Sequence, residues 1–198
     1  LAVDLFNKMA ENLHLKVDWA EEVTFEGTIP GLLTGRYDAV CTPLWPTAAR
    51  AREVQFVAPE FYAELGVWVR ADDHRFDGNL ARINNPDVTI AGVDGQIEQA
   101  VHDEQFPKAK MQSLPGGGDP AQAFLNVMTG KVDVTFVDRA AGALFNKTRK
   151  EKLRNIADKP LRVFPFSIAV GGNEWRLKNM LDQAVIELQN TNYTDRLL

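Results

Sequence analysis

The stretch TGRYDAV at residues 34–40 returns as TGKVDVT at residues 129–135. Each copy follows an apolar run with helical spacing and precedes a strand-like segment. Glycine just past a helix adopts the left-handed conformation that ends it, and a basic residue there favours the negative end of the helix dipole. The Asp of each copy then opens a buried parallel strand. The repeat therefore predicts one helix–turn–strand unit used twice, in two α/β lobes with a functional cleft between them.

The order of the expected elements divides the chain between the two lobes. Apolar periodicity predicts that the chain leaves lobe 1 near residues 67–69, builds lobe 2, and returns near residues 166–168. We therefore expect lobe 1 at residues 1–68 plus 167–198 and lobe 2 at residues 69–166. Two crossing strands would form the hinge. The expected helices cover 3–12, 25–33, 96–103, 120–128, 139–146 and 175–189, and the expected strands include 15–19, 39–42, 65–70, 88–93, 110–114 and 164–170.

Composition narrows the function classes. The 198 residues are 45% hydrophobic, which is enough for real cores, and no apolar run could span a bilayer. A net charge of −5 argues against nucleic acid as a partner. Cys41 is the single cysteine, and the three histidines lack metal-ligand spacing. The glycines at 116–118 lack the lysine and hydroxyl of a P-loop, so a flexible loop is expected there. We expect no metal and no other cofactor.

The sequence opens directly on an amphipathic helix, with Val3, Phe6 and Met9 at helical spacing. A doubly wound sheet normally has a strand before this helix. We therefore expect either that an N-terminal segment precedes Leu1 in the complete protein, or that the lobe is cut down. A signal segment would lie in that part.

Several motifs together resemble one family. They are IPGLLTGRYDAV at 29–40, TAAR at 47–50 followed by VQF at 54–56, and GKVD at 130–133 in a segment ending at Asp138. The chain resembles the type II periplasmic solute-binding proteins of ABC importers, in the branch that binds polar amino acids. The resemblance covers nearly the whole chain and lacks the family's first strand. It implies a two-lobed α/β fold, each lobe a sheet flanked by helices.

Arg50 is the first candidate ligand-binding residue. It lies just beyond a lobe 1 strand, where ligands of open α/β sheets bind. A guanidinium holds a carboxylate through two parallel hydrogen bonds. Spacing alone favours a surface arginine, although Arg52, two residues on, could be the one that faces solvent. The resemblance implies that Arg50 grips the ligand's α-carboxylate and that Thr47 opens the same motif.

Lobe 2 offers an acid and a helix start. The resemblance implies that Asp138, at the cleft end of a strand, pairs with the ligand's α-ammonium; capping the helix that begins at Arg139 is the alternative. Free N–H groups at a helix start bind anions, which makes Gly95, Gln96 and Ile97 candidates. The family often has Gly-Thr-Thr there, so the hydroxyl donors are gone. Gln122 is a weaker candidate.

The loop after the first repeat strand departs from the family pattern. Trp45 stands where the family usually has a small Ser or Thr, so it either packs or narrows the pocket. Phe25 has the same two roles open, and we expect it in the cleft wall. The backbone carbonyls of Thr42, Pro43 and Leu44 are expected to face an ammonium.

These features favour an extracytoplasmic binding protein over an enzyme. We expect capture of a small zwitterionic or carboxylate ligand, an amino acid or an analogue, for delivery to the transmembrane subunits of an ABC permease. The expected location is periplasmic or extracellular, with or without a membrane anchor, and the expected state is a monomer. Two alternatives stay open: a ligand-binding sensor domain of a membrane receptor, and an enzyme resembling cyclohexadienyl dehydratase on the same scaffold.

Overall fold

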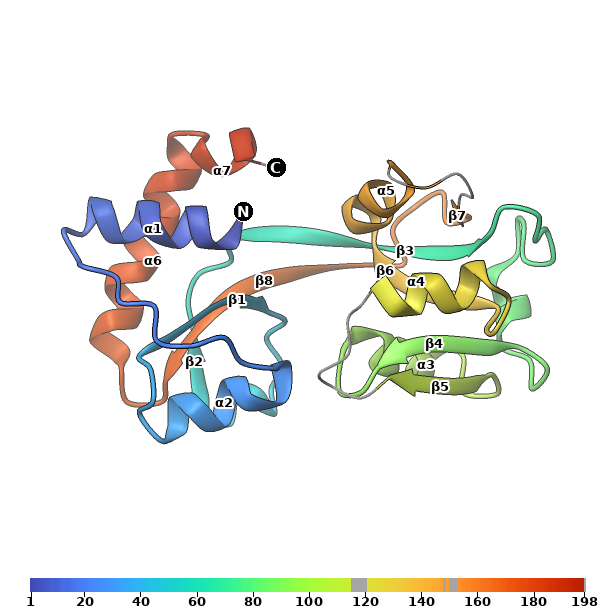
Figure 1. The fold of residues 1–198 in the computed structure, drawn as a ribbon, viewed down its shortest axis with the longest axis horizontal. Coiled ribbons are helices and arrows are strands. Elements are labelled where there is room, and N and C mark those ends of the chain that lie inside the picture. Colours follow the sequence, from blue (N-terminus) through green and yellow to red (C-terminus); the bar gives the residue numbers. More distant parts are fainter. Residues whose placement is uncertain (115–120, 148, 150–152, 198) are drawn as a thin grey trace. The chain divides into compact units, whose positions relative to one another are not determined.

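The computed structural model describes residues 1–114, 121–147, 149 and 153–197. The chain divides into two compact units, Leu1–Tyr62 with Pro165–Leu198, and Ala63–Phe164 (Figure 1). It passes from one unit to the other twice, within the long strands β3 (Phe61–Arg70) and β8 (Arg162–Gly171). Helices and strands alternate along the chain, so the architecture is the mixed α/β type that the sequence predicts.

Unit 1 is built on strands that pair with β8. Strands β1 (Ala39–Leu44) and β2 (Val54–Phe56) are both antiparallel to it. Helices α1 (Ala2–Asn12) and α6 (Trp175–Asn190) pack together over this sheet (Figure 1). Their shared core contains Leu5 and Met9 of α1 with Leu181 and Leu188 of α6, each of which is at most 3% exposed. Removal of these apolar faces from water stabilises the unit. The short α7 (Tyr193–Leu197) follows α6.

A second apolar cluster lies under helix α2 (Phe25–Leu33). It joins Leu32 of α2 to Val40 and Leu44 of β1 and to Val54 of β2. This cluster anchors the C-terminal end of β1, from which the loop carrying Trp45 and Arg50 emerges.

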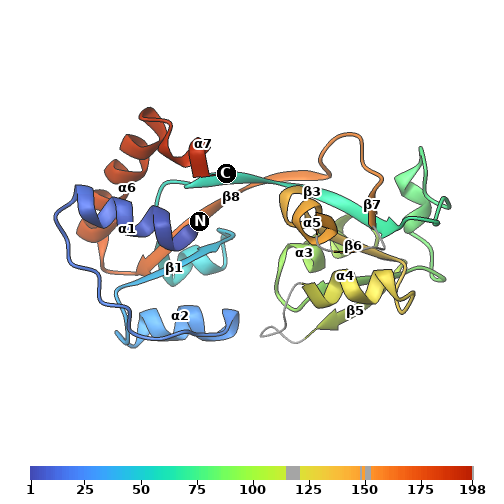
Figure 2. The ribbon, with the colours of Figure 1, turned by 45° about the horizontal axis from the view of Figure 1, so that its top comes forward.

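Unit 2 has a mixed sheet with β4 (Thr89–Val93) parallel to both β5 (Lys110–Leu114) and β6 (Val134–Asp138). Strand β3 pairs antiparallel with β6 and with β7 (Leu153–Asn155). Ala91 packs in the cluster of α4 (Ala121–Met128), whereas the neighbouring Gly92 faces Glu98 of α3 (Ile97–Gln105). Successive strand residues point to opposite faces, so α3 and α4 cover opposite sides of the sheet (Figure 2). Helix α5 (Arg139–Lys147) follows β6, and the 3₁₀ turn η2 (Leu80–Ile83) precedes β4.

The repeated phrase has the same local structure in both units. Gly35 and Gly130 have φ of 68° and 71°, the left-handed conformation expected of each. In both copies the threonine hydroxyl donates to the carbonyl four residues earlier, at 2.9 Å for Thr34 and 2.8 Å for Thr129. The basic residue after each glycine donates its N–H to the carbonyl five residues back. This pattern closes a helix end, as the sequence predicts.

One expected strand is absent from the described residues. Residues 15–19 have no regular structure, although their apolar alternation predicts a strand. In the described part of the chain, β1 pairs with β8 alone, so no neighbouring strand supplies backbone partners to this segment. Trp19 is instead half-exposed and lies 5.8 Å from the ring of Phe6. The predicted loop at 116–118 lies outside the described residues.

Candidate ligand-binding site

The loop after β1 is closed by hydrogen bonds to Arg50. The hydroxyl Oγ1 of Thr47 accepts the backbone N–H of Arg50 at 3.1 Å, and Arg50 Nη1 donates to the carbonyl of Trp45 at 2.8 Å. Arg50 begins the 3₁₀ turn η1 (Arg50–Arg52). Sequence reasoning expected the motif, but not that the arginine would bind its own loop. Thr47 therefore positions Arg50. This role could have been predicted from the sequence, because a hydroxyl residue three positions before the arginine can accept its backbone N–H.

Arg50 and Arg52 have different surroundings. Arg50 is half-buried, and burial lowers the pKa of its guanidinium, which stays a cation at neutral pH. Arg52 is exposed and lines an open groove together with Asp38, Glu53 and Glu174. The partly desolvated arginine is the better carboxylate partner, because an ion pair strengthens as water is excluded.

The other candidate residues of unit 1 differ in burial. Leu44 is 2% exposed and belongs to the core under α2, so its side chain supports the loop, and only its backbone could meet a ligand. Phe25 begins α2 and packs against the same cluster. Thr42 is exposed, Trp45 is half-buried, and the pairing of β1 with β8 is irregular between Val40 and Leu44, a segment that includes Pro43.

In unit 2 the candidate residues lie at one edge of the sheet. The parallel register places Ile90 opposite Val134 and Ala91 opposite Thr135. Continued by three residues, it places Asp94 opposite Asp138. The turn at Gly95 and the acid Asp138 therefore stand on neighbouring strands at their carboxyl ends, where open α/β sheets bind ligands.

Asp138 already has a structural task. Its carboxylate Oδ1 accepts the backbone N–H of Ala141 at 2.9 Å and so caps α5. A carboxylate has two oxygens with about four acceptor sites, so capping leaves capacity for a ligand ammonium. Asp138 therefore has the capping role that was the alternative from the sequence, and this role does not prevent it from binding a ligand.

The start of α3 is less open than the sequence suggests. Gly95 has φ of 71° and turns the chain, Gln96 is the N-cap residue without a side-chain cap bond, and Ile97 is only 8% exposed. Glu98 in the first helical turn is buried, and burial raises its pKa to about 7, while the backbone N–H groups of Glu98 and Val93 lower it. Sequence reasoning missed this acid, since a glutamate in a first turn normally faces water.

Neither a metal centre nor a membrane span emerges from the described ranges. Across residues 1–114, 121–147, 149 and 153–197, no three His, Cys, Asp or Glu residues gather where they could hold a metal ion. Among the helices in those ranges, none is long and apolar enough to cross a membrane.

Comparison with known proteins settles the family. The sequence model of the bacterial extracellular solute-binding proteins, family 3, matches residues 1–197. The chain belongs to this family. The family 3 assignment agrees with the resemblance carried by the motifs at 29–40, 47–50 and 130–133.

Individual relatives are distant in sequence, and the solved structures among them are similar in fold. The amino-acid-binding protein AabA of Dichelobacter nodosus is 23% identical over 98% of this chain and 75% of its own length. An ancestral amino acid-binding protein, a precursor of cyclohexadienyl dehydratase, is 25% identical, with a TM-score of 0.84 over 99% of this chain and 82% of its own. A lysine-bound binding component of an ABC transporter from Wolinella succinogenes is 21% identical, with a TM-score of 0.87 over the same shares. These likenesses confirm the predicted fold class.

Proposed function

We propose that the protein captures an amino acid between its two units, which act as the two lobes of the binding protein. The observation that carries this is the half-buried Arg50, oriented by Thr47 and Trp45 at the end of β1. Family membership supports the proposal, and so do the ligands of fold relatives, which include lysine, arginine and glutamine.

In this proposal the two charged ends of the ligand are held by different units. Arg50, whose Nη1 donates to the Trp45 carbonyl, binds the α-carboxylate through its guanidinium, a planar group with five N–H donors that can hold a carboxylate through two parallel bonds. Asp138 accepts the α-ammonium with the acceptor sites that Ala141 leaves. The backbone at Gly95, Gln96 and Ile97 lines the same edge of unit 2. Ligand contacts made only when both units engage shift the population toward the closed form.

We further propose delivery of the ligand to an ABC permease in the periplasm or at the outer cell surface, without catalysis. The sensor-domain alternative has the same binding step and differs in what receives the signal. The enzyme alternative stays open because one fold relative, an ancestral amino acid-binding protein, is a precursor of cyclohexadienyl dehydratase. Incubation with a cyclohexadienyl substrate distinguishes a binding protein from the enzyme. A binding protein releases no aromatic product, and sustained release would establish the enzyme.

A thermal-shift screen of the twenty amino acids tests the binding step. A ligand at 100 times its Kd stabilises the folded state by about 2.7 kcal/mol, which raises the unfolding midpoint by several degrees. We expect at least one amino acid, and decarboxylated analogues of it should give no shift because they lack the group that Arg50 holds. A screen in which no amino acid shifts the midpoint would contradict the proposal.

A further inference from the structure

Glu60 is a buried acid that ligand binding does not use. It lies immediately before β3 in unit 1 and is 2% exposed. Neither carboxyl oxygen has a hydrogen-bond partner among the described residues. A buried carboxylate without a partner is strongly destabilising, so the group is held as the neutral acid. Burial accordingly raises its pKa to about 7.

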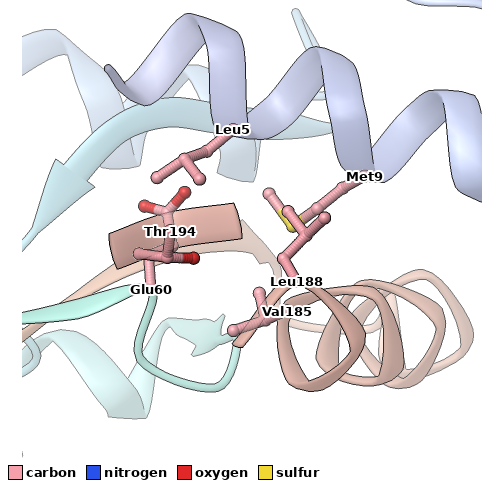
Figure 3. A pocket seen from close by; sticks show the side chains of 6 residues that line it. All are labelled: Leu5, Met9, Glu60, Val185, Leu188 and Thr194. Atoms are coloured by element: carbon pink, nitrogen blue, oxygen red, sulfur yellow. The ribbon is translucent and has the colours of Figure 1, made fainter. Parts of the chain in front are cut away.

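The walls around this carboxyl group are apolar. Figure 3 shows its side chain among Leu5 and Met9 of α1 and Val185 and Leu188 of α6. Thr194 of α7 completes the lining, and the pocket has no room for a water molecule. A water that could stabilise the ionised form is therefore excluded unless one of the three helices moves away.

Among the described residues that line the pocket, none besides Glu60 has a charged side chain that could offset the charge of its ionised form. Burial and the charge of Glu60 raise the pKa of the Cys41 thiol on β1 to about 11, so that thiol stays neutral. The N-terminal ammonium of Leu1 lowers the pKa of the same thiol, and it pairs with Asp4 at 3.0 Å. The charged residues of the covering helices do not line the pocket: Asp4, Glu11, Arg176, Glu187, Asp195 and Arg196 are exposed, Lys8 pairs with Glu11, and Lys178 pairs with Asp182.

The three covering helices differ in how firmly they are held. Helix α6 contributes four buried residues and α1 three, whereas α7 buries Thr194 alone among its described residues, with Tyr193 half-buried against the core. Burial of apolar surface holds a helix in place, and α7 offers the least of it. Helix α7 is therefore the cover that moves at least cost.

We propose that Glu60 is a proton-controlled latch for α7. The neutral acid permits α7 to close over the pocket, and the ionised acid releases α7 so that water reaches the carboxylate. The latch acts where the crossing strands leave unit 1, since the backbone N–H of Glu60 donates to the carbonyl of Phe166 at 2.9 Å. Phe61 also packs on Phe166, with ring centroids 5.4 Å apart.

Hydrogen–deuterium exchange of the α7 amides, measured from pH 5 to pH 8 and corrected for intrinsic exchange rates, tests the latch. The opening equilibrium constant of the wild type should rise by up to about tenfold per pH unit up to about pH 7, because in that range only the open form is ionised. Above about pH 7 it should level off, because the closed form then ionises too. Glu60→Gln, which cannot ionise, should show no such rise. Glu98→Gln, a buried acid changed in unit 2, is the matched control and should keep it.

A second measurement needs no variant. The carboxyl carbon resonance of Glu60 in the wild type should titrate near neutral pH, together with the amides of α7. Opening of α7 that is independent of pH, or that rises equally in Glu60→Gln, would overturn the latch. Titration of the Glu60 carboxyl at the ordinary value of an exposed glutamate would overturn it as well.

Discussion

Arg50 Nη1 donates a hydrogen bond to the backbone carbonyl of Trp45 at 2.8 Å. The bond ties the side chain to the start of its own loop, while Thr47 holds its backbone. An arginine fixed in this way loses less side-chain entropy when a ligand binds. The loop therefore presents a preorganised cation.

Thr47→Ala should weaken ligand binding without changing the ligand's own contacts. The substitution removes the Oγ1 that accepts the Arg50 N–H, a bond of the capping kind whose loss costs about 0.5–2 kcal/mol. Calorimetric titration should show a two- to thirtyfold rise in Kd. Thr42→Ala is the control, because Thr42 is exposed and keeps its backbone carbonyl. Equal affinities for the two variants would remove Thr47 from the site.

Asp138→Asn separates capping from ligand binding. Asparagine caps helices about as well as aspartate, so the unfolding midpoint should change little. The negative charge is lost, and the ligand ammonium then lacks its partner, which costs roughly 2–5 kcal/mol of binding free energy in a desolvated site. Asp138→Ala should lose both properties. If Asp138→Asn binds the ligand as the wild type does, the acid is only the cap of α5.

Gly31→Ala should destabilise unit 1. A Cβ at Gly31 would lie 2.0 Å from the hydroxyl oxygen of Tyr37, which donates to the carbonyl of Gly27 at 2.8 Å. Forced displacement of a packed side chain typically costs 1–3 kcal/mol. Gly27→Ala is the matched control on the same helix, since its Cβ would meet neighbours at 3.6 Å and alanine favours helices. The midpoint of denaturant unfolding should therefore fall for Gly31→Ala and rise for Gly27→Ala.

Fold stability should fall as pH rises from about 4.5 to 7. The ordinary pKa of a glutamate is 4.5, and burial raises that of both Glu60 and Glu98 to about 7. In this window the folded state binds more protons than the unfolded state, so the free energy of unfolding decreases as pH rises. Across the whole window the decrease is on the order of 3 kcal/mol for each of the two acids. Denaturant midpoints of the wild type and of Glu98→Gln should diverge across the same window. Parallel curves would contradict the raised pKa of Glu98.

Sequence patterns predicted the elements of this fold well where local rules act alone. The helix ends at Gly35 and Gly130, the positions of the strands that follow them, and the crossing strands all depend on glycine conformation and apolar periodicity. The predicted parallel direction is correct for β6, which is parallel to β4, and wrong for β1, which pairs antiparallel with β8 in the described residues. The strand predicted at 15–19 is wrong. A strand needs a neighbouring strand, and the alternation of apolar and polar residues in one segment does not say whether a partner strand lies beside it.

The site was predictable by position and less so by contact. The motif at 47–50 located Arg50 after a strand, but its bond to the Trp45 carbonyl depends on the path of the loop. The buried acids were missed for a related reason: Glu60 and Glu98 are polar by residue type, and their burial is decided by helices distant in sequence or by the sheet beneath them.

Calorimetric titration of Arg50 variants with the amino acid found by the thermal-shift screen tests the proposed function most directly. Arg50→Ala leaves the ligand carboxylate unpaired, which should cost roughly 2–5 kcal/mol, a loss of about 30-fold to several thousand-fold in affinity. Arg50→Lys should recover only part of this, because an ammonium cannot form the two parallel bonds of a guanidinium. Arg52→Ala, at the exposed neighbour, should bind nearly as the wild type does. Wild-type affinity in Arg50→Ala would contradict the assignment of this site.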